Sequence, residues 1–410
     1  MRNIVIVGAS LAGTRAAETL RAEGFTGTIT MVGDEPHKPY DRPPLSKNYL
    51  AGEWEAERIA LRKPEALEEL NLTWKLGVAA TALDTADHTV TLATGEQVHY
   101  DGLIIATGGT VRRLPNQPNL AGIHVLRSLD DATSLRDELN AGTRVVVIGA
   151  GFIGLEAAAT ATKRGAQVTV LEGLEAPLIR ALGAEMGRGI GEVHARNGVK
   201  IRCGVSVASI NGSARVESIT LADGEVVPAD VVIVGIGVAP ATGWCEGAGL
   251  TIDNGIVCDA TLNAGVPHVY AAGDLLRWPN NLFTDVEPLM RVEHWTNAAE
   301  QGAHAAKNLL AEMDGGERMP YEAVPFFWSD QFDARIQFLG RVTADATAEV
   351  VAGDVASGKW CAMYVANDRL VGVLGVSMPK LVMPSRALLS TRTSAADARA
   401  HFARVTAPPA

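Results

Sequence analysis

The 410-residue chain contains few cysteines, and their spacing excludes several kinds of site. The four residues, Cys203, Cys245, Cys258 and Cys361, lie far apart. They form neither a CxxC pair nor a spacing typical of zinc sites or disulfide frameworks. A chain without a disulfide pattern fits a reducing compartment, so we expect a cytoplasmic protein.

Histidine and aromatic residues are also scarce. The nine histidines contain no HxxxH or HExxH pattern, so the sequence predicts no metal site. Aromatic residues make up 5% of the chain, which makes the tryptophans at 295 and 328 noticeable.

The sequence has fewer basic than acidic residues, which gives a net charge of −11 and a pI near 5.4. This balance argues against nucleic acid or an anionic membrane as the main partner. No segment reaches the ~18 uninterrupted apolar residues of a membrane span, and Gly8 and Gly13 interrupt the apolar run that superficially resembles a signal peptide. The length predicts two or three domains.

Glycine is abundant and follows predicted strands. Residues 3–7 predict a buried strand, residues 11–24 a helix and residues 28–34 a second strand. The turn Gly8-Ala9-Ser10-Leu11-Ala12-Gly13 would present the helix N-terminus to a phosphate, and Asp34 could bind ribose hydroxyls. Ser10 replaces the usual middle glycine, so its hydroxyl must point away from a pyrophosphate or donate to it. Alone, the pattern is equally consistent with simple helix packing.

A second fingerprint is intact. A strand at residues 144–148 leads into Gly149-x-Gly151-x-x-Gly154 and a helix. The three glycines serve a tight turn, close approach to a pyrophosphate and close helix–strand packing.

An acid, Glu172, follows the next predicted strand at residues 167–171. A carboxylate there binds the 2′-hydroxyl of NAD and repels a 2′-phosphate, which predicts NADH rather than NADPH. Two dinucleotide sites imply two dinucleotides, and the first is most simply a site for FAD.

Two further predicted strands end in small residues. Residues 101–109 end in Ala106, Thr107 and Gly108, and residues 268–278 contain Gly273 and Asp274. Small residues let a backbone approach a ligand, and Asp274 could bind a polyol hydroxyl. Each segment also fits an ordinary strand exit.

Six separated segments, in order, carry a family resemblance: PYDRPPLSK, IIATGG, VVIGAGFIGLEAAA, VYAAGD, VEHWTNAAEQG and PFFWSDQ. From Asn3 to about Gly340 the chain resembles the FAD-dependent, NADH-using ferredoxin reductases of bacterial oxygenase and cytochrome P450 systems. Beyond Asp345 the likeness is one of architecture.

The resemblance implies an α/β fold with two doubly wound, Rossmann-like dinucleotide-binding domains and a C-terminal α+β domain with an antiparallel sheet. It assigns residues 1–110 and 241–320 to an FAD domain, 111–240 to an NAD domain and 321–410 to a ferredoxin-facing domain. Independently, residues 359–378 read as two strands joined by a turn at Asn367-Asp368.

The resemblance also gives the PPLSK lysine a role. Lys47 and Glu156 occupy the positions of a lysine–glutamate pair near the reactive N5 edge of the flavin. A cation there would stabilise negative charge on the reduced ring, and the carboxylate would neutralise it when the flavin is oxidised. Pro43 and Pro44 would restrict the loop. The alternative is a surface lysine after a turn.

Other assignments follow by position. The FAD side takes Ala12, Asp34, Arg42, Lys47, Ala80, Arg127, Asp274, Trp295 and Trp328. The NAD side takes Gly149, Gly151, Phe152, Ile153, Gly154, Glu156, Glu172 and Gly237.

Three of these assignments carry particular expectations. Arg127 could neutralise pyrophosphate, whereas a strand interior explains Ala80 equally well. Trp295 is expected to act with Lys47 and Glu156. Both tryptophans either pass electrons toward ferredoxin or pack in the core.

The predicted reaction transfers hydride from nicotinamide C4 to flavin N5. Electrons then pass singly from FAD to a [2Fe–2S] ferredoxin that serves a Rieske dioxygenase or a cytochrome P450. Residues 320–410 carry a net charge of +1 against −12 for the rest, which suits a transient, acidic ferredoxin. Arg291, Arg335 and Arg341 are candidate contacts. We expect a monomer or weak homodimer.

Two alternatives remain open. An NADH oxidase or rubredoxin reductase would use nearly the same residues, and an NADH-sensing flavoprotein could switch its own association instead of turning over. Flavoprotein disulfide reductases share the fold but need a CxxxxC pair on the FAD domain, which this sequence lacks.

Overall fold

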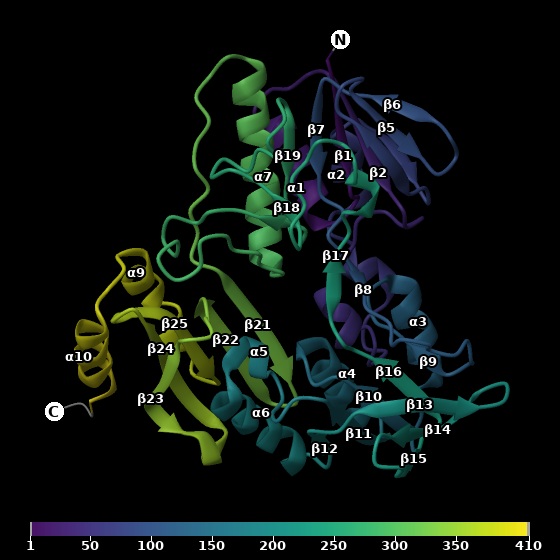
Figure 1. Ribbon diagram of the computed structural model, residues 1–410, viewed down its shortest axis with the longest axis vertical. Coiled ribbons are helices and arrows are strands. Elements are labelled where there is room, and N and C mark those ends of the chain that lie inside the picture. The colour runs from purple at the N-terminus through teal and green to yellow at the C-terminus, as the bar shows by residue number, and fades with distance from the viewer. Residues whose placement is uncertain (1, 408–410) are drawn as a thin grey trace. The chain divides into compact units, whose positions relative to one another are not determined.

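The computed structural model describes residues 2–407 and divides into two compact units. The first unit comprises the chain up to Asp41, Ala60–Thr110 and Ala239–Phe326. The second comprises Arg42–Ile59, Val111–Val238 and the chain from Phe327 onward. Each unit contains a five-stranded parallel sheet, and an antiparallel sheet follows toward the C-terminus (Figure 1). The predicted fold class is confirmed, whereas the three predicted domain boundaries stay a prediction.

The parallel sheet of the first unit has the strand order β19-β7-β1-β2-β3. Its strands span Asn3–Val7 (β1), Thr28–Gly33 (β2), Leu72–Leu76 (β3), Gly102–Ile105 (β7) and Val269–Ala271 (β19). All except the edge strand β3 are mainly buried and apolar, as expected of a parallel sheet covered on both faces. Because β2 and β3 lie on one side of β1 and the later strand β7 lies on the other, the strand order reverses at β1, and a ligand-binding crevice is expected at the carboxyl ends of these strands.

Two helices of this unit pack against each other, α1 (Leu11–Ala22) and α7 (Trp295–Met313). Their contact is close because Gly302 lies against the carbonyl group of Ala12, where a Cβ atom would collide. Smaller elements complete the unit: α2 (Pro64–Glu69), β4 (Ala80–Asp84), β5 (Thr89–Leu92), β6 (Gln97–His99), β18 (Ile256–Val257) and β20 (Leu276–Arg277).

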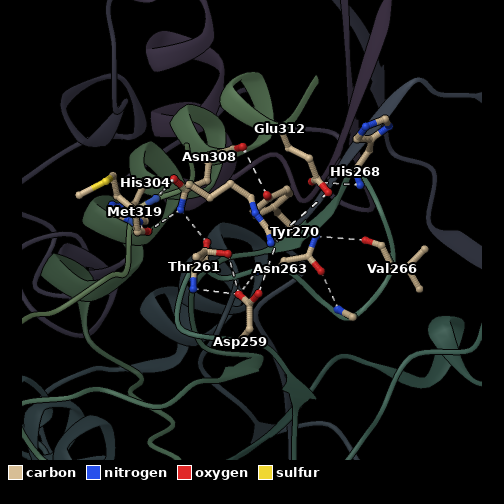
Figure 2. A network of polar contacts seen from close by, with 12 residues as sticks. Asp259, Thr261, Asn263, Val266, His268, Tyr270, His304, Asn308, Glu312 and Met319 are labelled. Atoms are coloured by element: carbon tan, nitrogen blue, oxygen red, sulfur yellow. Dashed lines mark hydrogen bonds and ion pairs between the residues drawn. The ribbon is translucent and has the colours of Figure 1, made fainter. Parts of the chain in front are cut away.

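A polar network fixes the C-terminal half of α7 to neighbouring loops (Figure 2). The Asn308 amide donates to the carbonyl oxygens of Thr261 and Met319, each at 2.8 Å, and accepts from the Met319 N–H at 2.9 Å. One turn later, Glu312 accepts from the His268 N–H at 3.2 Å. Because the buried Asn308 amide has both donors and acceptors satisfied in this way, the C-terminal half of α7 is tied to the loops that contain Thr261 and Met319.

The parallel sheet of the second unit has the order β12-β11-β10-β16-β9. Its strands span Ile123–His124 (β9), Arg144–Ile148 (β10), Gln167–Glu172 (β11), Lys200–Cys203 (β12) and Val231–Val234 (β16). The accompanying helices are α3 (Leu129–Glu138), α4 (Phe152–Lys163), α5 (Ile179–Leu182) and α6 (Ala184–Arg196). A small antiparallel sheet joins β13 (Val207–Gly212), β14 (Val216–Leu221) and β15 (Val226–Pro228). Strands β8 (Gly109–Val111) and β17 (Val238–Pro240) each contain a point at which the chain passes from one unit to the other.

The antiparallel sheet has the order β21-β22-β25-β24-β23. Its strands span Phe326–Gln331 (β21), Ala334–Gly340 (β22), Thr347–Asp354 (β23), Lys359–Ala366 (β24) and Arg369–Val376 (β25). Asn367 and Asp368 both have positive φ, 49° and 54°, as a two-residue hairpin turn requires. Helices α8 (Pro379–Val382), α9 (Ser385–Ser390) and α10 (Ala395–Thr406) pack on this sheet.

Of the helices within residues 2–407, none is long and apolar enough to span a bilayer.

Candidate functional site

The first glycine turn connects β1 to α1. Gly8 has a φ of +124°, and a Cβ atom there would collide with the carbonyl oxygen of Ala106. Gly13 likewise touches the Gly8 carbonyl group, so both glycines are needed sterically. Ser10 is the N-cap of α1, and its hydroxyl makes no capping hydrogen bond within the described chain. Because the first turn of α1 carries no acidic residue, its N–H groups present an uncompensated positive end that fits a phosphate.

Other predicted residues lie at the same edge of this sheet. The Ala106 N–H donates to the carbonyl of Val7, and Thr107 donates through its hydroxyl to Ala241 at 2.8 Å. Beyond β19, Gly273 donates its N–H to Gln301 at 2.9 Å and lies 3.5 Å from the Ala12 side chain, measured from the position of an added Cβ. The structure therefore brings the turn after β1, the Ala106–Gly108 segment and the Gly273-Asp274 segment together.

Three more predicted residues, Asp34, Trp295 and Ala80, belong to the first unit. Asp34 is exposed and directly follows β2. Trp295 begins α7 with 37% of its surface exposed, and its indole Nε1–H donates to Asp41 Oδ1 at 2.6 Å. Ala80 begins β4 in the small antiparallel sheet, where it is partly buried against the core, and its assignment to FAD stays a prediction.

The second glycine turn, between β10 and α4, has one open position. Gly149 (φ +101°) touches the Gly235 carbonyl group and Gly154 touches the Gly149 carbonyl group, so a Cβ atom at either residue would collide. At Gly151, in contrast, an added Cβ atom would meet no described atom within 4 Å. The space in front of Gly151, at a helix N-terminus without acidic residues, fits a pyrophosphate.

Glu172 closes this turn from the end of β11. Its carboxylate accepts from the Ala150 N–H at 2.7 Å and from the Leu174 N–H at 2.9 Å. These backbone donors hold the carboxylate in place beside the glycine turn. Gly237 lies beyond β16 with φ +99°, and its carbonyl accepts from the Arg112 N–H at 2.9 Å.

Lys47 and Glu156 form an ion pair inside the second unit. The Lys47 Nζ lies 2.6 Å from Glu156 Oε2, and the two side chains are 17% and 4% exposed. Lys47 follows a 3₁₀ turn, η1 (Pro43–Ser46), whose two prolines fix its backbone, and Glu156 lies in α4. The structure therefore excludes the alternative in which Lys47 is an exposed surface lysine.

Two serines complete the surroundings of Glu156. Ser46 Oγ donates to Oε2 and Ser329 Oγ donates to Oε1, each at 2.5 Å. The η1 turn is tied to α4 a second time, since Thr160 donates to the Ser46 carbonyl oxygen at 2.7 Å. The buried carboxylate therefore has three donors, the Lys47 ammonium and two serine hydroxyls, which fix its orientation.

Five more predicted residues, Arg42, Arg127, Phe152, Ile153 and Trp328, belong to the second unit. Arg42 donates to the carbonyl oxygen of Arg127 at 2.6 Å, which joins the start of the η1 segment to the residue before Ser128, the N-cap of α3. Phe152, at the start of α4, contacts the ring of Phe327 with centroids 4.8 Å apart. Ile153 is 47% exposed, and Trp328 in β21 is half-buried.

Comparison with known proteins decides the family. The chain matches the family model of pyridine nucleotide-disulphide oxidoreductases over residues 2–302, and a reductase C-terminal family over residues 326–405. The chain belongs to the pyridine nucleotide-disulphide oxidoreductase family. This family membership and the sequence resemblance agree.

Relatives within this family are similar over nearly the whole chain. Rhodocoxin reductase of Rhodococcus erythropolis is 40% identical over 95% of this chain and 90% of its own length. Putidaredoxin reductase of Pseudomonas putida is 36% identical over 95% of this chain and 92% of its own. The crystal structure of the covalent putidaredoxin reductase–putidaredoxin complex contains a chain with 34% identity and a TM-score of 0.90, with 99% of both chains covered. The predicted resemblance to ferredoxin reductases of oxygenase systems is confirmed.

This family member offers no thiol pair for disulphide chemistry. Its four cysteines are free thiols, and three of them are buried. Burial raises the pKa of Cys245 and of Cys361 to about 12, so both stay protonated at neutral pH. No group of three or more metal-ligating side chains occurs within the described range, residues 2–407.

Sequence reasoning passed over two groups that surround Glu156. Ser46 and Ser329 were contained in the quoted PPLSK and FFWSDQ segments, but neither was singled out. In β21 burial alternates, with Ser329 and Gln331 buried and Trp328 and Asp330 less so. A polar residue on the buried side of a predicted strand is the signal that points to Ser329.

Proposed function

We propose that this protein is an NADH-dependent ferredoxin reductase that carries FAD and delivers electrons singly to a [2Fe–2S] ferredoxin of an oxygenase system. The observation that carries the proposal is the buried Lys47–Glu156 ion pair at 2.6 Å, in a chain without a redox cysteine pair. A fixed ammonium supports negative charge that develops on a neighbouring group, and it needs no reorganisation to do so. The relatives named above support ferredoxin as the acceptor.

The chain's own residues would hold the cofactors in distinct ways. When bound, FAD supplies the chemistry that accepts a hydride from NADH and releases electrons one at a time. In the first unit, the N–H groups after Gly8 would bind its pyrophosphate, with Asp34 and Asp274 on hydroxyl groups. Lys47 would supply positive charge toward the flavin, and Glu156 would orient it.

Trp295 would take part in the transfer of electrons to ferredoxin. Its indole is anchored by Asp41 yet more than a third exposed, as a residue facing a transient protein partner needs to be.

The second glycine turn would bind the nicotinamide dinucleotide. The open position at Gly151 fits the NAD pyrophosphate, and Glu172 would bind the ribose 2′-hydroxyl. We therefore expect kcat/KM to be higher for NADH than for NADPH.

Replacing Glu172 with Gln removes a charged hydrogen-bond acceptor, so kcat/KM for NADH should fall by about tenfold. The exposed Glu175→Gln is the control, and equal values for NADH and NADPH in the unmodified protein would contradict this assignment.

The proposal is tested by measuring NADH oxidation by the purified protein with cytochrome c as final acceptor, with and without a small [2Fe–2S] ferredoxin. We expect ferredoxin to raise cytochrome c reduction many-fold while oxygen uptake stays low. Fast oxygen uptake that ferredoxin does not change would identify an oxidase. A reduced flavin that persists without either activity would identify an NADH-sensing switch.

A further inference from the structure

The Lys47–Glu156 pair is one end of a longer buried chain of hydrogen bonds. Ser329 Oγ donates to Glu156 Oε1 at 2.5 Å, and Gln331 Nε2 donates to Ser329 Oγ at 3.0 Å. Gln331 Oε1 lies 2.8 Å from Nε2 of His194. All five side chains belong to the second unit, and the exposed fractions of Ser329, Gln331 and His194 are 1% or less.

The hydrogen bonds of this chain all run in one direction. The Gln331 amide uses its NH₂ group on Ser329, so its oxygen faces His194 and requires a hydrogen on Nε2. Nε2–H thus donates to Gln331, Gln331 to Ser329, and Ser329 to the carboxylate of Glu156. Because each bond in such a chain polarises the next, the bond from Ser329 to the Glu156 carboxylate is strengthened.

His194 fixes the far end of the chain. It lies in α6 with its ring 5.1 Å from that of Phe332, and its Nδ1 has no hydrogen-bond partner among residues 2–407. Burial lowers the pKa of His194, so the ring is neutral at pH 7. A neutral ring with its hydrogen on Nε2 leaves only a lone pair on Nδ1, so the unpartnered nitrogen is an acceptor and not a buried N–H donor.

Other charged groups on the elements packed here bind elsewhere. On α4, Lys163 donates to the Phe332 carbonyl oxygen at 3.1 Å. On β21, Asp330 lies 3.5 Å from Arg335. On α6, Arg196 donates to backbone carbonyl oxygens. Lys47, Glu156 and His194 are therefore the titratable groups that define the chain.

We propose that Ser329, Gln331 and His194 are positioning residues that hold the Glu156 carboxylate in the orientation in which it binds Lys47. The inference rests on the proposed function, in which Lys47 assists reduction of the flavin by NADH. Its consequence is that removing one hydrogen bond of this chain slows flavin reduction although Lys47 itself is unchanged.

The first test compares Ser329→Ala with Ser385→Ala in the FAD-loaded protein. Ser385 is a matched control because it is fully buried in the same unit, where it donates to the Leu381 carbonyl oxygen at 2.7 Å. Stopped-flow absorbance follows flavin reduction by NADH. We expect Ser329→Ala to lose about tenfold in rate, because Glu156 loses the hydrogen bond that orients it.

Under the same conditions, Ser385→Ala should keep the rate of the unmodified protein, and Ser329→Thr should restore that rate because it returns the hydroxyl donor. Equal rates for Ser329→Ala and Ser385→Ala would overturn the proposal.

A second measurement is independent of turnover and of any folding defect at Ser329. Nitrogen-15 NMR of the histidine rings in the unmodified holoenzyme should show His194 neutral, with its hydrogen on Nε2, across neutral pH. Gln331→Leu should change that signal while the signals of exposed histidines stay the same. A charged His194, or a hydrogen on Nδ1, would overturn the inference.

Lys47→Met separates this inference from the function on which it rests. If Lys47→Met slows flavin reduction and Ser329→Ala does not, the positioning chain alone is wrong. If Lys47→Met leaves the rate unchanged, the proposed role of the ion pair is wrong.

Discussion

Lys47 illustrates how a short motif positions one atom. Two prolines fix the η1 turn, Thr160 ties that turn to α4, and Glu156 holds the ammonium at 2.6 Å. Because the side chain is largely removed from water, its charge acts at short range with little screening. The residue is therefore suited to support negative charge on a bound group, which a freely rotating surface lysine could not do as well.

Replacing Lys47 with Met should slow flavin reduction by NADH at least tenfold, about 1.4 kcal/mol in activation free energy. Stopped-flow absorbance measures the rate, and the exposed Lys380→Met serves as the control. Since the single change leaves Glu156 buried without its cation, the double variant Lys47→Met/Glu156→Gln should fold more stably yet remain slow. A rate equal to that of the control would refute the assignment.

His194 gives the molecule a defined dependence of stability on pH. Burial lowers its pKa from 6.5, so the unfolded chain binds a proton that the folded chain does not. Above pH 6.5 the neutral His194 leaves the free energy of unfolding unchanged. As the pH falls from 6.5 toward the pKa of His194 in the folded protein, the free energy of unfolding decreases. The loss approaches about 1.4 kcal/mol per pH unit.

Unfolding by denaturant at a series of pH values measures this slope. His194→Gln should have a shallower loss of stability below pH 6.5 than the unmodified protein, whereas the exposed His99→Gln should keep the original slope. Equal slopes in all three proteins would contradict the account of His194.

The regular elements near the glycine turns were predictable because their signals are local. The strand predicted at residues 144–148 matches β10, and that predicted at residues 28–34 ends one residue earlier in β2. The hairpin at Asn367-Asp368 is also confirmed. Apolar runs bounded by glycine, and a turn that needs positive φ, are properties of a few consecutive residues.

The second glycine turn contains two positions with different steric requirements, Gly151 and Gly154. Gly151→Ala adds a Cβ atom in open space, so we expect the free energy of unfolding to change by less than about 1 kcal/mol. The same atom would lie where the pyrophosphate is expected, so KM for NADH should rise about tenfold. Gly154→Ala instead meets the Gly149 carbonyl group and should destabilise the fold by about 1–3 kcal/mol.

Chemical denaturation and steady-state kinetics on both variants separate these effects. A Gly151→Ala protein that is as unstable as Gly154→Ala, with an unchanged KM, would show that the open position is not a nucleotide site.

At the scale of the whole molecule, the predictable part was the family architecture. Two parallel sheets and a C-terminal antiparallel sheet followed from motifs in a fixed order. The environment of Glu156 did not follow, because it joins residues 46, 156, 329, 331 and 194, which no local pattern relates. Hydrogen bonds between distant segments depend on the packing of whole elements, and single-sequence patterns do not encode that packing.

Charge at this scale predicts how a ferredoxin would bind. The near-neutral segment from residue 320 onward contrasts with the acidic remainder, so a few arginines there should attract an acidic partner. We expect KM for ferredoxin to rise several-fold as salt is added, because exposed charges are screened over about 10 Å at 0.1 M.

Arg335→Glu should raise KM for ferredoxin at low salt, whereas the exposed Arg113→Glu, with the same change of charge, should have a smaller effect. Steady-state cytochrome c reduction measures both effects. A KM that is insensitive to salt would argue against electrostatic docking.

The central claim is that one NADH supplies two single electrons to ferredoxin. The most direct measurement mixes the purified flavoprotein anaerobically with one equivalent of NADH and then with excess oxidised [2Fe–2S] ferredoxin, and follows ferredoxin reduction by absorbance. The account predicts two ferredoxins reduced for each NADH consumed, at a rate fast enough for turnover. Flavin that remains reduced beside oxidised ferredoxin would contradict it.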